Sequence, residues 1–214
     1  MTITELDRQF VINTYKRFPI EIVSGHGSLA YDRNGREYID LTSGIGVTSF
    51  GYTDGAWCRA VTEQVNRLQH TSNLYYTEPC ARLAEALCAR TGMNKVFFSN
   101  SGAEANECAI KAARAYAAKN KGAEYFTVAT LENSFHGRTL TTLAATGQAK
   151  FHEKFQPLTP GFISIPANDF DAFVRTAEKE NLATVMIECV QGEGGVNVLE
   201  KDYVQKLAEY AAAH

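Results

Sequence analysis

Three short stretches of this 214-residue chain carry residue types that could bind a small anionic or aromatic ligand. In the first, Ser101, Gly102 and Ala103 stand between an apolar run and an alanine-rich helical pattern. The first amides of a helix have no partners within it, so they point N–H groups and positive charge at whatever lies in front. Gly102 lets the backbone approach closely, and the Ser101 hydroxyl adds a donor. The pattern predicts a phosphate site, and a capped helix start without a ligand is the alternative.

The second stretch is Ser134–Arg138, with the sequence Ser-Phe-His-Gly-Arg. Phe135 offers a flat face to an aromatic ligand, and Arg138 offers two parallel donors to a carboxylate. A core aromatic is the alternative for Phe135, and a hydrogen-bonded structural residue is the favoured interpretation of His136. Arginine is unfavourable beside the positive end of a helix dipole, which indicates a functional purpose for Arg138.

The third stretch follows an apolar run and contains Glu188 and Glu193, with Gly194 and Gly195 beside them. Either acid could attract a cationic amine or pair with an arginine, and a solvated loop acid is the alternative for Glu193. The two glycines permit unusual backbone angles next to a ligand. No Gly-x-Gly-x-x-Gly follows a predicted strand, so a dinucleotide-dependent oxidoreductase is a distant alternative.

From residue 95 onward, the hydrophobic pattern alternates between short apolar runs and helical periodicity. This alternation predicts an α/β fold with a mostly parallel sheet flanked by helices. Because ligands bind at the carboxyl ends of parallel strands, the three stretches are expected to converge on one crevice. The predicted strands cover 95–99, 125–130, 162–165 and 184–189, and the predicted helices cover 103–119, 138–145, 169–181 and 201–213.

The first fifty residues read as a small substructure that is extended and rich in turns. Residues 28–31 and 36–40 flank the turn Asp32-Arg33-Asn34-Gly35, which predicts a β-hairpin. Helical periodicity then covers 54–70 and 78–91. We therefore predict a division between residues 1–50 and residues 51–214.

The composition of the chain excludes several kinds of binding partner. The formal net charge is −3, which provides no basic field for nucleic acid and favours small-molecule partners. No run is long enough to cross a membrane, and the N-terminal residues lack the apolar core of a signal peptide. The five cysteines show no metal-ligand spacing, so we predict no metal site and reduced thiols in a cytoplasmic protein.

Together these segments resemble the class III pyridoxal-phosphate-dependent aminotransferases over essentially the whole chain. The likeness includes residues 14–20 (TYKRFPI), 40–47 (DLTSGIGV) and 73–79 (NLYYTEP). Within the family, Asn106-Glu107 and residues 144–148 (AATGQ) are more similar to the branch that uses N2-acetylornithine than to the ornithine or 4-aminobutyrate branches.

The resemblance implies a role in cofactor binding for five residues. Ser101, Gly102 and Ala103 would hold the phosphate of pyridoxal 5'-phosphate, and Phe135 would stack on its ring. Glu188 would belong to the network behind that ring.

The same resemblance implies how substrates bind. Arg138 and Tyr15 would bind a substrate carboxylate, and Glu193 would act near a gate that admits either an amine donor or a dicarboxylate acceptor. Residues 43–47 and 73–76 would line the neighbouring subunit's site in a homodimer.

The resemblance further implies a fold and a reaction. The fold is that of fold type I pyridoxal-phosphate-dependent transferases, with residues 1–50 in the small domain and 51–214 in a large cofactor-binding domain whose sheet is incomplete. The reaction would move the ω-amino group of N2-acetylornithine to 2-oxoglutarate in arginine biosynthesis. Ornithine, 4-aminobutyrate or succinyl-diaminopimelate are alternative donors, and a non-catalytic remnant or split-gene half is the alternative outside catalysis.

Two departures from the family pattern bear on activity. Cys189 stands where the family usually has proline, which affects no proposed contact. The lysine that forms the Schiff base, the aspartate that pairs with the cofactor ring and the arginine that partners the gate glutamate would all lie beyond His214. The resemblance therefore implies no catalytic residue within this chain, and an inactive chain in isolation.

Overall fold

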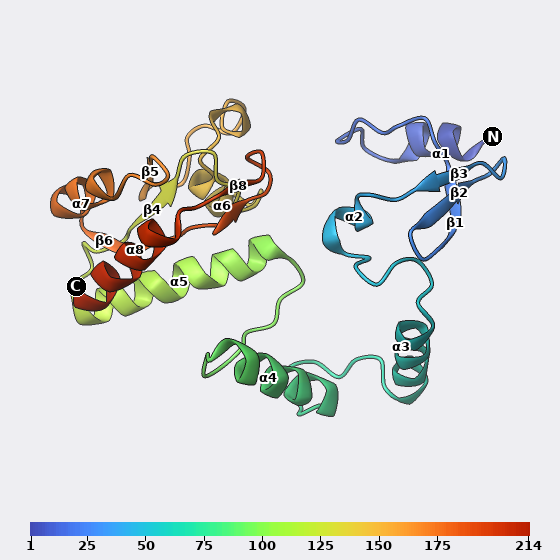
Figure 1. The fold of residues 1–214 in the computed structure, drawn as a ribbon, viewed down its shortest axis with the longest axis horizontal. Coiled ribbons are helices and arrows are strands. Elements are labelled where there is room, and N and C mark those ends of the chain that lie inside the picture. The colour runs from blue at the N-terminus through green and yellow to red at the C-terminus, as the bar shows by residue number, and fades with distance from the viewer. The chain divides into compact units, whose positions relative to one another are not determined.

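The computed structural model describes residues 1–214, which form two compact units, Met1–Leu83 and Ala84–His214 (Figure 1). The boundary falls inside helix α4, Glu78–Thr91. The division at residue 50 concerns domains of the complete fold and stays a prediction. No helix is both long and apolar enough to cross a bilayer.

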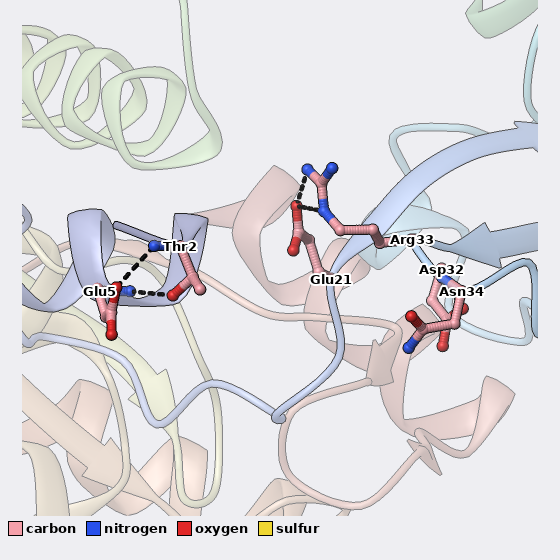
Figure 2. A network of polar contacts seen from close by, with 6 residues as sticks. All are labelled: Thr2, Glu5, Glu21, Asp32, Arg33 and Asn34. Carbon is pink, nitrogen blue, oxygen red and sulfur yellow. Dashed lines mark hydrogen bonds and ion pairs between the residues drawn. The ribbon is translucent and has the colours of Figure 1, made fainter.

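The first unit begins with helix α1, Ile3–Phe10. Thr2 and Glu5 form a reciprocal cap at its start, where the Thr2 amide donates to Glu5 Oε2 at 2.7 Å and the Glu5 amide donates to Thr2 Oγ1 at 3.2 Å (Figure 2). Each bond satisfies an amide that the helix leaves unpaired. Our prediction of extended structure in the first fifty residues is therefore wrong for this segment. The spacing Thr-x-x-Glu is the pattern of a capped helix start and could have indicated the helix.

An antiparallel sheet follows, with β2 (Leu29–Asp32) between β1 (Ile22–His26) and β3 (Glu37–Ile39). The pairing of β2 with β3 confirms the predicted hairpin. Its turn is closed by Asp32, whose Oδ1 accepts the amides of Asn34 and Arg36 at 2.9 Å each. Within the turn, Arg33 Nε donates to Glu21 Oε1 at 2.8 Å (Figure 2).

Three helices follow the sheet, and the last of them crosses the boundary of the first unit. They are α2 (Ser43–Gly46), α3 (Gly55–Arg67) and α4. Asp54 caps α3 by accepting the Trp57 amide at 2.8 Å, and α3 ends where Leu68 adopts an extended backbone. The predicted helix at 54–70 is thus confirmed with a shorter C-terminal end, and the helix at 78–91 has the predicted bounds.

The second unit contains a parallel sheet in which β4 (Thr127–Leu131) lies between β5 (Phe162–Ile165) and β6 (Leu182–Val185). Every residue of β4 is buried, as expected for a central strand covered on both faces. A two-stranded antiparallel ribbon, β7 (Val190–Gln191) and β8 (Asn197–Val198), follows β6. The predicted fold class, a mostly parallel sheet with helices and a small N-terminal α+β segment, is confirmed.

Helices pack on both faces of this sheet. On one face, Val128 packs with Ile110 of α5 (Gly102–Asn120) and Ala145 of α6 (Leu140–Ala145). On the other, Leu131 belongs to a core that includes residues of α7 (Phe170–Lys179) and α8 (Lys201–Ala213). Val128 and Leu131 are an odd number of residues apart, so their side chains point to opposite faces.

Three predicted strands differ from the structure. Residues 95–99 form no strand, because no described strand pairs with them and an apolar run without a hydrogen-bonded neighbour gains no ladder. The strand predicted at 184–189 begins two residues earlier and ends four residues earlier, at Leu182–Val185, and the strand predicted at 125–130 is found at Thr127–Leu131. The ladder still reaches Met186, whose amide donates to the Ala129 carbonyl at 2.8 Å.

Leu131 provides a test of the core at the end of β4. It is fully buried, so Leu131→Ala should reduce the free energy of unfolding by about 2–5 kcal/mol, measured by urea denaturation. Leu140→Ala is the matched control, because Leu140 is 69% exposed and its loss should cost no more than about 0.5 kcal/mol. Equal losses in the two variants would contradict this core.

Candidate functional site

The start of α5 has the features of an anion site. Ser101 is its N-cap and accepts the Glu104 amide at 3.2 Å. The amides of Gly102 and Ala103 donate to no described acceptor. A Cβ added at Gly102 would meet nothing within 4 Å, so there is open space beside this residue. Two free amides at the positive end of a 19-residue helix can receive a phosphate.

The Glu104 carboxylate lies at the same helix start. It accepts hydrogen bonds from Asn100 Nδ2 at 3.2 Å and from Ser101 Oγ at 2.9 Å. These two bonds lower the pKa of Glu104 below its ordinary value. Glu104 is therefore an internal anion that interacts with the Ser101 hydroxyl and leaves the amides of Gly102 and Ala103 unpaired.

The loop that carries Phe135 follows β4 and is held by hydrogen bonds from several elements. The Phe135 amide donates to Glu188 Oε2 at 2.8 Å, and the His136 amide donates to Thr146 Oγ1 at 3.0 Å. Asn106 Nδ2, from α5, donates to the His136 carbonyl at 2.8 Å. The backbone on both sides of Phe135 is consequently fixed.

His136 is buried at 4% exposure, and its Nε2 has no hydrogen-bond partner. Burial lowers the pKa of its imidazole to about 4, so the ring is neutral near pH 7. The burial of the ring agrees with a structural role for His136, whereas the predicted hydrogen bond is missing at its Nε2.

Arg138 is exposed and lies close to two aromatic rings. Its guanidinium carbon is 5.9 Å from the centre of the Phe135 ring and 5.2 Å from that of Phe151, and the two rings meet edge to face at 5.8 Å. Cation–π attraction keeps the guanidinium next to the Phe135 ring. Since α6 begins at Leu140 with Thr139 as its N-cap, Arg138 precedes the helix and its donors stay free for a ligand.

Glu188 follows β6 and is half-buried. Burial raises the pKa of its carboxyl, the Phe135 amide opposes this by donating to it, and the negative charge of Glu193 raises it further. Glu193 itself is exposed. The site thus contains one partly desolvated acid and one solvated acid close enough to interact.

The structure brings most of the predicted site residues together within the second unit. A side chain at Gly137 would lie 2.8 Å from the Ala103 side chain, so the Phe135–Arg138 loop contacts the start of α5. The bond between Phe135 and Glu188 joins that loop to the segment after β6. The predicted convergence of the three stretches is therefore confirmed at these contacts.

Tyr15 belongs to the first unit. It is exposed and lines a cavity of about 450 Å³ together with Asp7, Arg8 and Arg17. Arg17 and Asp7 form an ion pair at 3.4 Å there. The joint action of Tyr15 with residues of the second unit stays a prediction.

Sequence reasoning missed residues that support the site without facing a ligand. Phe151, in a short 3₁₀ helix at Ala149–Phe151, holds the Arg138 guanidinium. Asn106 and Thr146 bond to the backbone of His136. Asn106 and Thr146 lie in the two segments that resemble the acetylornithine branch. The contact between Phe151 and Arg138 depends on tertiary packing, and no sequence pattern indicated it.

Comparison with known proteins identifies the family. The family described as Aminotransferase class-III matches residues 10–214, which is nearly the whole chain. The chain belongs to the class III aminotransferases. Members of this family depend on pyridoxal phosphate.

The curated relatives of this class III chain include acetylornithine aminotransferases. The protein of that name from Haemophilus ducreyi is 48% identical over 203 residues, which are 95% of this chain and 52% of the relative. The one from Methanocaldococcus jannaschii is 44% identical over 96% of this chain and 51% of the relative. The chain therefore spans about half the length of these curated relatives, corresponding to their N-terminal portion.

Solved class III structures share the fold. The ornithine aminotransferase from Toxoplasma gondii ME49 superposes with a TM-score of 0.91 at 30% identity, covering 98% of this chain and 50% of that protein. The N-acetylornithine aminotransferase from Stenotrophomonas maltophilia K279a gives 0.80 at 31% identity over 99% of this chain and 51% of that protein. The fold is thus that of half of a fold type I aminotransferase.

His136 should make stability depend on pH. Its pKa is 6.5 when unfolded and about 4 when folded, so the unfolded chain takes up the proton first as pH falls. The free energy of unfolding should decrease by up to about 3 kcal/mol between pH 7 and pH 4, and His136→Asn should remove that part of the decrease. A slope unchanged in His136→Asn would contradict this assignment.

The electrostatic interaction between Glu188 and Glu193 can be measured directly. Glu193→Gln removes a negative charge, so the pKa of Glu188 should fall while staying above its ordinary value because burial remains. Side-chain carboxyl NMR titration would follow it. Glu209→Gln, on the exposed side of α8, is the control and should leave the Glu188 titration unchanged. An unaltered pKa of Glu188 in Glu193→Gln would disprove the interaction.

Proposed function

We propose that this chain provides cofactor- and substrate-binding residues of an aminotransferase that moves the ω-amino group of N2-acetylornithine to 2-oxoglutarate. The observation that carries the proposal is the convergence of the α5 start, the Phe135 loop and Glu188, joined at Ala103 against Gly137 and at the bond between Phe135 and Glu188. The name acetylornithine aminotransferase, borne by relatives 41–48% identical to this chain, supports the choice of substrates.

The residues present fit a phosphate group. Gly102 and Ala103 offer two free amides at the positive end of α5, and nothing of the protein stands within 4 Å of the place that a Gly102 side chain would take. Ser101 Oγ adds a donor once Glu104 releases it. We assign the phosphate of pyridoxal 5'-phosphate to this position.

Phe135 and Glu188 would hold the rest of the cofactor. The Phe135 ring offers a flat face to a pyridine ring, and Glu188 fixes the backbone that presents this face. When bound, pyridoxal phosphate supplies an electron sink for charge that develops beside the reacting amine. Burial raises the pKa of Glu188 beside the Phe135 platform.

Arg138 is the proposed clamp for a substrate carboxylate. Its guanidinium lies beside the Phe135 ring, with donors free to form two parallel bonds to a carboxylate. Glu193 is exposed and anionic, so it attracts an amine at the far end of a donor and repels the second carboxylate of 2-oxoglutarate. Alternation between these substrates therefore requires Glu193 to pair with a cation when the dicarboxylate binds. By the family resemblance, Tyr15 would also bind a substrate carboxylate.

By the family resemblance, the lysine that anchors the cofactor falls outside residues 1–214. We therefore expect this chain alone to bind ligands without turnover. Residues 43–47 and 73–76 would contribute to a neighbouring site in a homodimer. A cytoplasmic location follows the same resemblance.

Ornithine is a second candidate donor, because the Toxoplasma gondii ornithine aminotransferase superposes better than the Stenotrophomonas enzyme, with TM-scores of 0.91 and 0.80. Steady-state formation of glutamate from 2-oxoglutarate, measured on the full-length polypeptide that carries this sequence, separates the two. A higher kcat/KM with N2-acetylornithine supports the proposal, and a higher value with ornithine overturns the choice of donor.

Gly102→Ala tests the phosphate position. The added methyl meets no protein atom, so stability should stay constant or rise by about 0.5–1 kcal/mol, whereas the methyl obstructs a close ligand. The Kd for pyridoxal phosphate, measured by absorbance titration, should rise about tenfold, as expected for the loss of a charge-assisted hydrogen bond.

Gly55→Ala is the matched control, since Gly55 is likewise the first residue after an N-cap, at the start of α3. It should leave the Kd unchanged. Equal affinities in Gly102→Ala and the parent chain would place the phosphate elsewhere.

A further inference from the structure

The peptide that follows Phe135 is held from two sides. The His136 amide donates to Thr146 Oγ1 at 3.0 Å, and the His136 carbonyl accepts from Asn106 Nδ2 at 2.8 Å. Thr146 is fully buried and its hydroxyl donates in turn to the Thr142 carbonyl at 3.0 Å. The backbone between Phe135 and Arg138 therefore has no free polar group at His136 with which to rearrange.

Close packing adds to these bonds. Gly137 has a φ of +133°, and a side chain there would lie 2.5 Å from Thr142 Oγ1 and 2.8 Å from the Ala103 side chain. The loop is thus pressed against α6 and against the first turn of α5. Glu107, one turn further along α5 than Ala103, continues the contact, since Thr139 Oγ1 donates to its carboxylate.

Asn106 occupies a particular place on α5. It lies four residues after Gly102, so both lie on one face of the helix, about 6 Å apart along its axis. Gly102 has the open amide at the helix start, and Asn106 holds the loop that presents the Phe135 ring. One rigid helical turn therefore separates the anion site at Gly102 from Asn106, which holds the loop of the Phe135 ring.

We propose that Asn106 is a positioning residue that fixes the Phe135 ring relative to the amides of Gly102 and Ala103. The site thereby selects ligands whose phosphate and flat ring are joined at one set distance. This inference rests on the proposed function for the identity of the ligand, but the clamp itself concerns only this chain's own atoms.

The test compares Asn106→Ala with Asn120→Ala. Asn120 is on the same helix, and its Nδ2 donates to the Tyr116 carbonyl at 2.7 Å, so both variants lose an amide bond to a backbone carbonyl. Amide hydrogen exchange in the ligand-free chain reports the clamp. Exchange at Phe135 and His136 should accelerate about tenfold in Asn106→Ala and stay unchanged in Asn120→Ala.

Ligand binding separates positioning from general damage. In Asn106→Ala the Kd for inorganic phosphate should stay within about twofold of the parent chain, while the Kd for pyridoxal phosphate rises about tenfold. A merely structural role would change both affinities equally, and that result overturns the proposal. Unchanged exchange at Phe135 and His136 also overturns it.

The proposed function can fail separately. If the parent chain binds no pyridoxal phosphate, the proposed function falls, and the exchange rates still decide whether Asn106 clamps the loop. If Asn106→Ala loses its helical circular dichroism, Asn106→Ser takes its place. The same exchange and affinity criteria then apply.

Discussion

The arrangement of the second unit depends on the burial of β4 between β5 and β6. Its five residues are all buried, and it has a parallel strand on each side, so all three strands end at the same edge of the sheet. The segments after β4 and β6 therefore emerge at the same edge. At this edge the Phe135 amide donates to the Glu188 carboxylate, and this hydrogen bond joins the segment after β4 to the segment after β6.

Both positive and negative groups contribute to the electrostatic potential of this site. The free amides of Gly102 and Ala103 provide positive potential, while Glu104 retains its charge through bonds from Asn100 and Ser101. Glu188 is shifted the other way by burial. The carboxyls of Glu104, at the start of α5, and Glu188, after β6, therefore have opposite pKa shifts, each caused by its own neighbours.

Sequence patterns predicted what local periodicity encodes. The helix at 78–91, the strand at 162–165 and the hairpin after residue 28 have the predicted bounds or nearly so, and the convergence at Gly137 and Glu188 followed from strand alternation. The run at 95–99 was misassigned because β-propensity cannot show whether a partner strand is present. Phe151 was missed because its contact with Arg138 depends on a 3₁₀ turn thirteen residues later in the chain.

The four-residue spacing between Gly102 and Asn106 constrains how this sequence can change. Each residue of an α-helix advances about 100° around the axis, so one residue inserted into that turn would swing the Asn106 carboxamide away from the His136 carbonyl. Glu104 and Ala105 are exposed, and their identities affect neither the angle nor the rise. Substitutions at these two positions therefore leave Asn106 in place, whereas the length of the turn is fixed.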